Sequence, residues 1–367
     1  MLHPPRRFLT PNEMIKLSFS AGLFTLLSVA SLGQTLAQKR LPIIDMHMHA
    51  RTASHYGTPP QPMCAEVTRM PVWDQTKSFG ESLASQPGPP ACRLLMSPMT
   101  DAALLSETLD VMKRYKMVGV LGGYDPDLVT KWVNAAPDRF IPGLDFRLDK
   151  ATGTASSAES GKEFKPFTPD EIRSLYRAGR LKVFAEITNQ YGGIRPDDPR
   201  MDPYWDVAEE LDIPVGIHLG PGGPGEPYLG NPNYRAHLQS ALTLEDLLVK
   251  RPKLRVYIMH SGYPFLDDLL AVLFTHPQVY VEVSMLANVE PRGAFHRFLK
   301  GIMDGGYGDR VMFGSDQMVW PGLIEPAIRG IETAPFLTPK QKRDIFYNNA
   351  ARFLRLSKED IARHHSF

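Results

Sequence analysis

The chain has 367 residues, of which 43% are hydrophobic and 22% are charged, and its formal net charge is +1. This composition is that of a globular protein with a core, and the small net charge gives no reason to expect a nucleic-acid partner. The length is normal for a single α/β barrel, and 33 prolines and 29 glycines predict many ordered loops.

The N-terminal region has the features of a targeting segment. Residues 19–32 are apolar but too few to span a bilayer comfortably, and the basic residues Arg6, Arg7 and Lys16 precede them. Ala37 supplies a small residue at a plausible cleavage point. We therefore expect residues 1–37 to be a signal peptide and residues 38–367 to be one periplasmic or secreted domain without stable membrane insertion. An uncleaved anchor is the alternative.

Short apolar runs alternate with stretches of helical periodicity along the rest of the chain, a pattern typical of parallel strands with connecting helices. The expected strands are 43–47, 117–121, 140–146, 181–187, 213–218, 254–260, 279–283 and 311–314. The expected helices are 100–115, 126–136, 169–178, 204–211, 244–250, 265–274, 295–303, 323–333 and 340–353. Eight such strands predict a closed (β/α)8 TIM barrel.

Two long connections interrupt this rhythm. Residues 51–98 lie between the first strand and the first helix, and a connection of that length is usually a lid or a binding loop. The only two cysteines, Cys64 and Cys92, lie in it, and in an oxidising compartment we expect them to pair. Residues 150–167 are rich in Ser, Gly and Lys and are expected to form a surface excursion.

Polar residues capable of binding a metal stand where several predicted strands end. In a strand, side chains alternate between faces, so His47 and His49 point the same way, with Asp45 one step deeper. His218 and His260 end two later strands, and Asp316 follows the last one. A buried imidazole or carboxylate without a partner is costly, and a metal ion would supply the partner.

These motifs resemble the amidohydrolase superfamily, and more narrowly its amidohydrolase-2 group. The resemblance is carried by Asp45-Met-His47-Met-His49, by the His218 and His260 strand ends, by Phe313-Gly-Ser-Asp316 and by Asn348-Asn-Ala-Ala-Arg-Phe353. It spans about residues 41–356 and implies metal binding by His47, His49, His218 and Asp316, with His260 either binding a second ion or acting in catalysis. Asp45 is expected to orient a ligand histidine.

Glu186 bears on the number of metal ions. It ends the fourth predicted strand, where binuclear relatives place a bridging carboxylate, whereas mononuclear decarboxylases of the group generally lack an acid there. A salt-bridged or supporting acid is the alternative reading of Glu186. Lys182 could be carbamylated instead, but it lies four residues earlier and so too deep. The nitrogen and oxygen ligands suit Zn first, and Mn, Co or Fe as well, in one or two ions.

The resemblance implies a hydrolase in which metal-activated water attacks a small ester, lactone or amide. Asp316 would transfer the proton, and His260 would bind the second ion or stabilise negative charge. The alternatives are a mononuclear decarboxylase of an aromatic or unsaturated acid, and a non-catalytic binding barrel. The expected substrate contacts are Arg147, Tyr263 and Trp320, with Ser284, Gln317, Arg235 and His237 as further candidates. Pairing with Asp145 or Asp149 is the alternative for Arg147. The other histidines of the mature chain, including His55, are expected to be surface or structural residues. The partner is a small molecule, and a homo-oligomer remains open.

Overall fold

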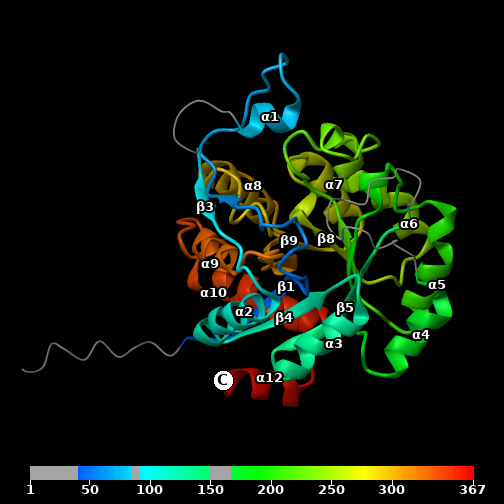
Figure 1. Ribbon diagram of the computed structural model, residues 1–367. Coiled ribbons are helices and arrows are strands. Elements are labelled where there is room, and N and C mark those ends of the chain that lie inside the picture. Colours follow the sequence, from blue (N-terminus) through cyan, green and yellow to red (C-terminus); the bar gives the residue numbers. More distant parts are fainter. Residues whose placement is uncertain (1–39, 85–90, 149–166) are drawn as a thin grey trace, which may run out of the picture. The chain divides into compact units, whose positions relative to one another are not determined.

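Eight parallel strands form the centre of the fold, and helices lie between and outside them (Figure 1). The computed structural model describes residues 40–84, 91–148 and 167–367, and Leu41–Phe367 form one compact unit. The strands follow one another around the sheet in chain order: β1 (Ile43–His49), β4 (Met117–Gly122), β5 (Phe140–Phe146), β6 (Val183–Ile187), β7 (Val215–His218), β8 (Val256–Met259), β9 (Tyr280–Glu282) and β10 (Val311–Met312).

Backbone hydrogen bonds bring the two ends of this sheet together. The Met46 N–H of β1 donates to the Phe313 carbonyl just after β10 at 2.9 Å, and the Asp316 N–H donates to the His47 carbonyl at 2.8 Å. The predicted TIM barrel is therefore confirmed. Because β1 and the segment after β10 are neighbours, residues from opposite ends of the chain meet above the barrel.

The helices follow the strands as the periodicity predicted. They are α2 (Asp101–Tyr115), α3 (Pro126–Ala135), α4 (Pro169–Arg177), α5 (Asp202–Glu210), α6 (Glu245–Lys250), α7 (Leu266–Thr275), α8 (Arg292–Asp304) and α9 (Ile324–Glu332). The expected caps are present: the Thr100 hydroxyl accepts the Ala103 N–H, and Thr168 forms a capping box with Glu171.

The C-terminal segment departs from the expected single helix over 340–353. It consists of α10 (Pro339–Arg343), a π-helical turn (Asp344–Asn348) and α11 (Asn349–Phe353), and a further helix, α12 (Lys358–His365), was not predicted. The expected signal peptide and residues 150–166 of the expected surface excursion lie outside the described residues. None of the described helices is long and apolar enough to cross a membrane.

The inside of the barrel is packed with buried side chains. Tyr257 of β8 is fully buried there, and its hydroxyl donates to the Ala185 carbonyl at 3.0 Å. Gly216 on the neighbouring strand makes room for the ring, because a Cβ at that position would lie 2.5 Å from Tyr257 Cζ. This layer forms a rigid floor beneath the polar strand ends.

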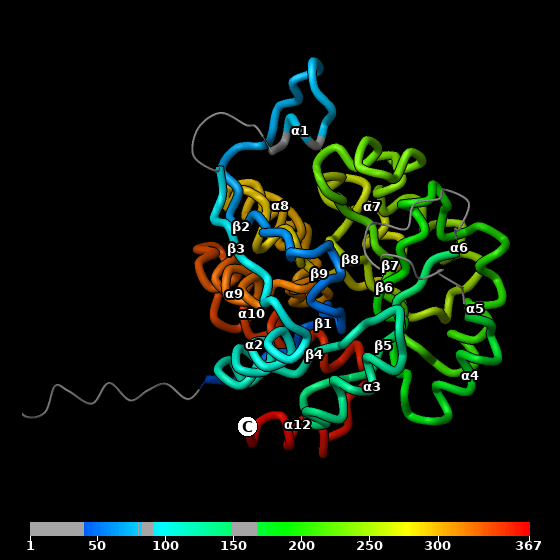
Figure 2. Tube along the Cα trace, in the orientation of Figure 1, coloured from blue at the N-terminus to red at the C-terminus, as the bar shows by residue number. Residues whose placement is uncertain are grey.

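The long connection after β1 has structure of its own, which the sequence did not predict. It contains β2 (Met63–Ala65), α1 (Phe79–Ala84) and β3 (Arg93–Leu95), and β2 pairs antiparallel with β3 (Figure 2). Cys64 and Cys92 form a disulfide with their Cα atoms 5.4 Å apart, as expected. The connection is fixed to the barrel by the Glu66 N–H, which donates to the Asn288 carbonyl at 2.7 Å.

Candidate metal centre and active site

The side chains predicted to bind metal meet at the C-terminal ends of the barrel strands. Three potential ligand atoms form the first cluster. His47 Nε2 lies 2.9 Å from His49 Nε2, and Asp316 Oδ1 lies 3.5 Å and 3.0 Å from these two nitrogens respectively. Donor atoms about 2.0–2.1 Å from one tetrahedral ion stand roughly 3.3 Å apart, so the cluster has the dimensions of a metal site.

A second cluster lies beside the first and comes from β6, β7 and the turn after β8. Glu186 Oε1 lies 2.7 Å from His218 Nδ1 and 4.0 Å from His260 Nε2, and these two nitrogens lie 3.1 Å from each other. The Glu186 carboxylate also faces the first cluster, with Oε1 3.7 Å from His47 Nε2 and Oε2 3.6 Å from His49 Nε2. One carboxylate therefore stands between two sets of ligand atoms.

Hydrogen bonds to the outer nitrogens set the tautomers of the first two histidines. His47 Nδ1 lies 3.1 Å from Glu282 Oε1, and His49 Nδ1 lies 2.9 Å from Asp145 Oδ2. A carboxylate accepts a proton-bearing N–H, so both Nδ1 atoms carry a hydrogen and both Nε2 atoms face the cluster, where each would offer a lone pair to a metal ion once it has lost its proton.

The same reasoning assigns a role to His260. Its Nδ1 lies 3.2 Å from the Ser284 carbonyl, an acceptor only, so Nδ1 donates and Nε2 presents a lone pair to Glu186 and His218. Burial, followed by the electrostatic effect of His218, lowers the pKa of His260 to about 4, so the His260 ring is neutral near pH 7. A neutral ring with an inward lone pair is arranged as a ligand.

Electrostatic interactions hold the carboxylates of the site in their charged form. Burial alone would raise the pKa of Asp316, but His47 and His49 hold it well below its usual range. The pKa of Glu186 is also lowered, because the hydrogen bond from His218 and the charges of His47 and His49 outweigh burial. Burial favours a lower pKa for His47, yet the carboxylates around it raise its pKa to about 10.

These residues fit a divalent metal. His47 Nε2 and His49 Nε2 face each other at 2.9 Å in a buried environment, so two lone pairs there would repel unless a cation lies between them. A proton on His47 is one such cation, and a metal ion also neutralises the carboxylates of Asp316 and Glu186. The first ion would be held by His47, His49 and Asp316, and the second by His218 and His260, with Glu186 facing both.

The local backbone is unusual where these ligands leave the barrel. His260 and Asp316 have φ angles of +57° and +48°, in the left-handed region that residues with a Cβ rarely adopt. Such conformations persist only where surrounding contacts impose them, and they cluster at functional sites. Here they turn both side chains back over the end of the barrel.

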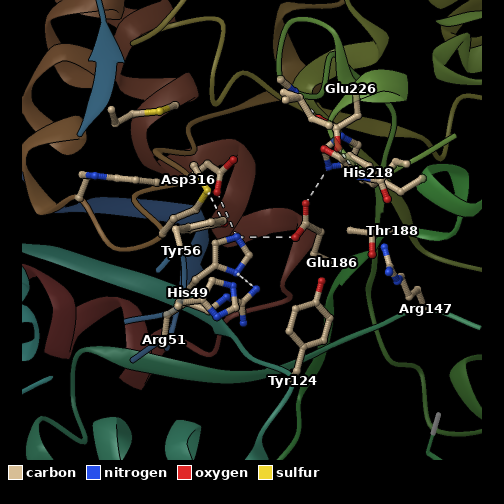
Figure 3. Close-up of a pocket in the computed structure, with 18 residues that line it drawn as sticks. His49, Arg51, Tyr56, Tyr124, Arg147, Glu186, Thr188, His218, Glu226 and Asp316 are labelled. Atoms are coloured by element: carbon tan, nitrogen blue, oxygen red, sulfur yellow. Dashed lines mark hydrogen bonds and ion pairs between the residues drawn. The ribbon is translucent and has the colours of Figure 1, made fainter. Parts of the chain in front are cut away.

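A cavity of about 320 Å³ opens above the clusters (Figure 3). His49, Glu186, His218 and Asp316 line it, while His47 and His260 are buried behind them with exposures of 2% and 0%. Further lining comes from Arg51, His55, Tyr56, Tyr124, Arg147, Thr188, Tyr191, Glu226, Asn231, Met318 and Trp320. Arg147 and Trp320, two of the residues expected to contact the substrate, are among those that line the cavity.

Several predictions about neighbouring residues need correction. Tyr263 does not line the cavity: its ring packs on Phe298 with centroids 5.1 Å apart, and its hydroxyl donates toward Glu290. The turn at His260 directs the chain outward before Tyr263 is reached. Arg235 and His237 are exposed and do not line the cavity.

Asp45 and Lys182 are likewise not placed to take part in the metal centre. Asp45 accepts the backbone N–H groups of His47 and Ser315 at 3.0 and 2.9 Å, so it holds the strand end and not a ligand imidazole. Lys182 is exposed below the barrel, where its backbone N–H donates to the Pro142 carbonyl, which agrees with the expectation that it lies too deep.

Other residues at the site were missed. Glu282 and Asp145 orient the histidines, Arg51 donates to Asp145 at 2.8 Å, and His55, which was expected to be a surface or structural residue, lines the cavity. Glu282 had a signal in the sequence, because it is an acid near the end of the buried run Val-Tyr-Val-Glu-Val-Ser. The alternative for Arg147 was an ion pair with Asp145 or Asp149; Asp145 pairs with Arg51, and Asp149 lies outside the described residues.

Fold and site together define a barrel enzyme of the metal-dependent kind. The chain belongs to the amidohydrolase family, whose profile matches residues 44–356. Comparison with curated proteins gave no match.

Solved structures share the barrel. An uncharacterised TIM-barrel protein of Bordetella bronchiseptica, Bb4693, is 21% identical with a TM-score of 0.52, covering 88% of this chain and 100% of its own. A 2,6-dihydroxybenzoate decarboxylase from Rhizobium is 14% identical with a TM-score of 0.53, covering 86% and 99%. The apo form of Metarhizium anisopliae IDCase is 17% identical with a TM-score of 0.51, covering 87% and 98%. At these identities the likeness concerns the fold alone.

Proposed function

We propose that the protein is a metal-dependent hydrolase that acts on a small ester, lactone or amide and holds two divalent ions. The observation that carries this proposal is the position of Glu186 between the cluster of His47, His49 and Asp316 and the cluster of His218 and His260. The inward lone pair of His260 supports it further, because a ring needed as a proton donor would present an N–H instead.

A divalent cation supplies two effects when bound: it lowers the pKa of a water molecule toward neutrality, and it polarises the oxygen of the bond to be broken. Asp316 lines the cavity and is ionised, so its carboxylate takes the proton from the attacking water and delivers it to the leaving group. Arg147 and Trp320 hold the substrate, Arg147 by charge and Trp320 by its ring face.

The number of ions tests this proposal. Elemental analysis of protein purified without chelator should give two ions per chain. Glu186→Gln removes the negative charge between the two clusters, so the weaker site should empty, and metal content should fall by about one ion with a large loss of turnover. One ion in both proteins, together with release of carbon dioxide from a carboxylated substrate, would identify a mononuclear decarboxylase instead.

We also propose that the protein is exported after removal of residues 1–37 and acts in the periplasm or outside the cell. The Cys64–Cys92 disulfide supports this, because disulfides persist in oxidising compartments. Fractionation of cells that express the full chain, with N-terminal sequencing of the product, tests it. A cytoplasmic product that retains residue 1 would contradict the proposal.

A further inference from the structure

Besides Arg51, whose Nε also lacks a partner, three residues that line the cavity outside the metal clusters have a buried polar atom without a hydrogen-bond partner among the described residues. The atoms are Asn231 Oδ1, His55 Nδ1 and Thr188 Oγ1, and the exposures of the three residues are 4%, 3% and 5%. They come from the connections after β7, β1 and β6, so no single loop explains them. Buried polar groups are nearly always paired, and three exceptions around one cavity indicate a missing partner.

Asn231 is the most informative of the three because its orientation is fixed. Its Nδ2 donates to Glu226 Oε1, and Glu226 is held in turn by the Gly223 N–H, which donates to Oε2 at 3.0 Å. With the amino group committed to a carboxylate, the atom left at the cavity is the carbonyl oxygen. A carbonyl oxygen accepts only, so this position calls for a ligand group that donates a hydrogen bond.

The charges around the cavity restrict which donor fits. Arg51 and Arg147 line the same cavity as the carboxylates of Glu186, Glu226 and Asp316, so the lining carries charges of both signs and a neutral donor is compatible with both. A hydroxyl is neutral and can both donate and accept a hydrogen bond. It can therefore donate to Asn231 Oδ1, and it can pair with His55 Nδ1 and Thr188 Oγ1 whether these atoms act as donors or as acceptors. Tyr56 stacks on Trp320 with centroids 5.0 Å apart and an interplanar angle of 19°, which provides a flat apolar wall beside these polar groups.

We propose that the cavity recognises a small hydroxylated substrate, whose hydroxyl groups pair with Asn231, His55 and Thr188 while the bond to be hydrolysed lies at the metal centre. This inference rests on the proposed hydrolase function and narrows its substrate class. A site with buried hydrogen-bonding groups discriminates strongly against an analogue that lacks the matching hydroxyl, because its own polar atoms are then left unpaired.

A matched pair of stable cyclic amides tests the inference without requiring turnover. D-Glucono-1,5-lactam and δ-valerolactam have the same ring with and without hydroxyl groups, and their binding to the metal-loaded protein is measured by calorimetry. We expect the hydroxylated lactam to bind at least tenfold more tightly. Thr188→Val keeps the side-chain shape and Asn231→Leu removes the amide, and each should reduce that preference about tenfold or more with metal content unchanged.

The control is Thr130→Val on α3, which does not line the cavity and should leave both affinities as in the wild type. Equal affinity for the two lactams, or failure of the hydroxylated lactam to bind the wild type, would overturn the inference. So would variants that weaken both lactams equally. If the hydroxylated lactam binds as expected but the corresponding lactone and esters are not hydrolysed, the proposed reaction fails while the recognition of hydroxyl groups stands.

Discussion

The Ser284 hydroxyl donates a 2.8 Å hydrogen bond to Glu282 Oε1, and this buried pair contacts histidines of both metal clusters. Ser284 Oγ lies 3.0 Å from His47 Nδ1 and 3.0 Å from His260 Nδ1. Glu282 Oε1 also accepts the His260 N–H at 2.9 Å, and Oε2 accepts the Ser284 N–H at 2.6 Å. Both carboxylate oxygens therefore face fixed backbone donors.

Glu282→Gln should lower metal affinity at both clusters. Whichever way the glutamine amide points, its NH2 group meets a backbone N–H, so the contacts that orient His47 and His260 are lost. We expect affinity to fall by about 10–100-fold, as is usual when a group behind a ligand histidine is changed. Zinc titration of the chelator-treated protein measures this. Glu290→Gln, which alters an acid that accepts the Tyr263 hydroxyl and belongs to neither metal cluster, is the control and should bind zinc normally.

Gly314→Ala should reproduce much of this defect without changing a polar group. A Cβ at position 314 would lie 2.2 Å from Glu282 Oε2 and 3.1 Å from His47 Cβ, so the carboxylate must move. Overpacking of this kind typically costs about 1–3 kcal/mol of stability, and here it should also weaken zinc binding. Wild-type zinc affinity and unfolding midpoint in this variant would show that the carboxylate relaxes without consequence.

Removal of the metal should destabilise the protein and abolish turnover. Ligands that bind only the folded state stabilise it by mass action, by about 4 kcal/mol when the free ion is a thousandfold above its Kd. Without an ion, buried lone pairs and carboxylates at the centre must be neutralised by protons. Differential scanning calorimetry before and after chelation should show a lower Tm that recovers when Zn or Mn is restored. An unchanged Tm and full activity after verified removal would refute the assignment of the site.

His364 should make stability depend on pH below neutrality. Burial, followed by the charge of Arg363, lowers its pKa to about 4, and Tyr347 Oη lies 3.1 Å from its Nδ1. The unfolded chain binds the proton near pH 6.5, so stability is fully present above that pH and is lost as pH falls toward 4. Allowing for partial screening near the surface, the loss should be about 2 kcal/mol.

Urea unfolding at pH 7 and pH 4.5 measures this loss, and His364→Leu should reduce the difference between the two values. The matched change at its exposed neighbour, His365→Leu, should leave the difference as in the wild type. If both variants keep the wild-type pH dependence, other groups are responsible for it.

Breaking the Cys64–Cys92 disulfide should loosen the cavity wall. The bond closes a segment with a sequence separation of 28, adjoining Met63, which lines the cavity, and Gln61, whose carbonyl accepts the Trp320 indole N–H at 2.9 Å. Replacing both cysteines by serine should lower the free energy of unfolding by roughly 3–4 kcal/mol in the chain-entropy model. Faster proteolysis at residues 61–84 should accompany this, and unchanged stability and protease resistance would count against a role for the bond.

The sequence by itself determined the barrel and the ligand positions. Each core strand is a short apolar or β-branched run, and alternation along β1 places His47 and His49 on one face whatever the rest of the chain does. His218 and Asp316 could be placed likewise, since polar residues at the C-terminal ends of parallel strands converge once a barrel closes. These are local patterns, and local patterns can be read from sequence.

Only the tertiary structure decided how the ligands are oriented and what surrounds them. Glu282 lies 235 residues from His47 and meets it because β9 and β1 curve around the same barrel axis. The turn at His260 moves Tyr263 away from the cavity, whereas the connection after β1 brings His55 to it. Such contacts depend on register, on left-handed backbone turns and on long-range packing. None of these leaves a periodic signature in the sequence, so their chemistry became visible only when the chain was folded.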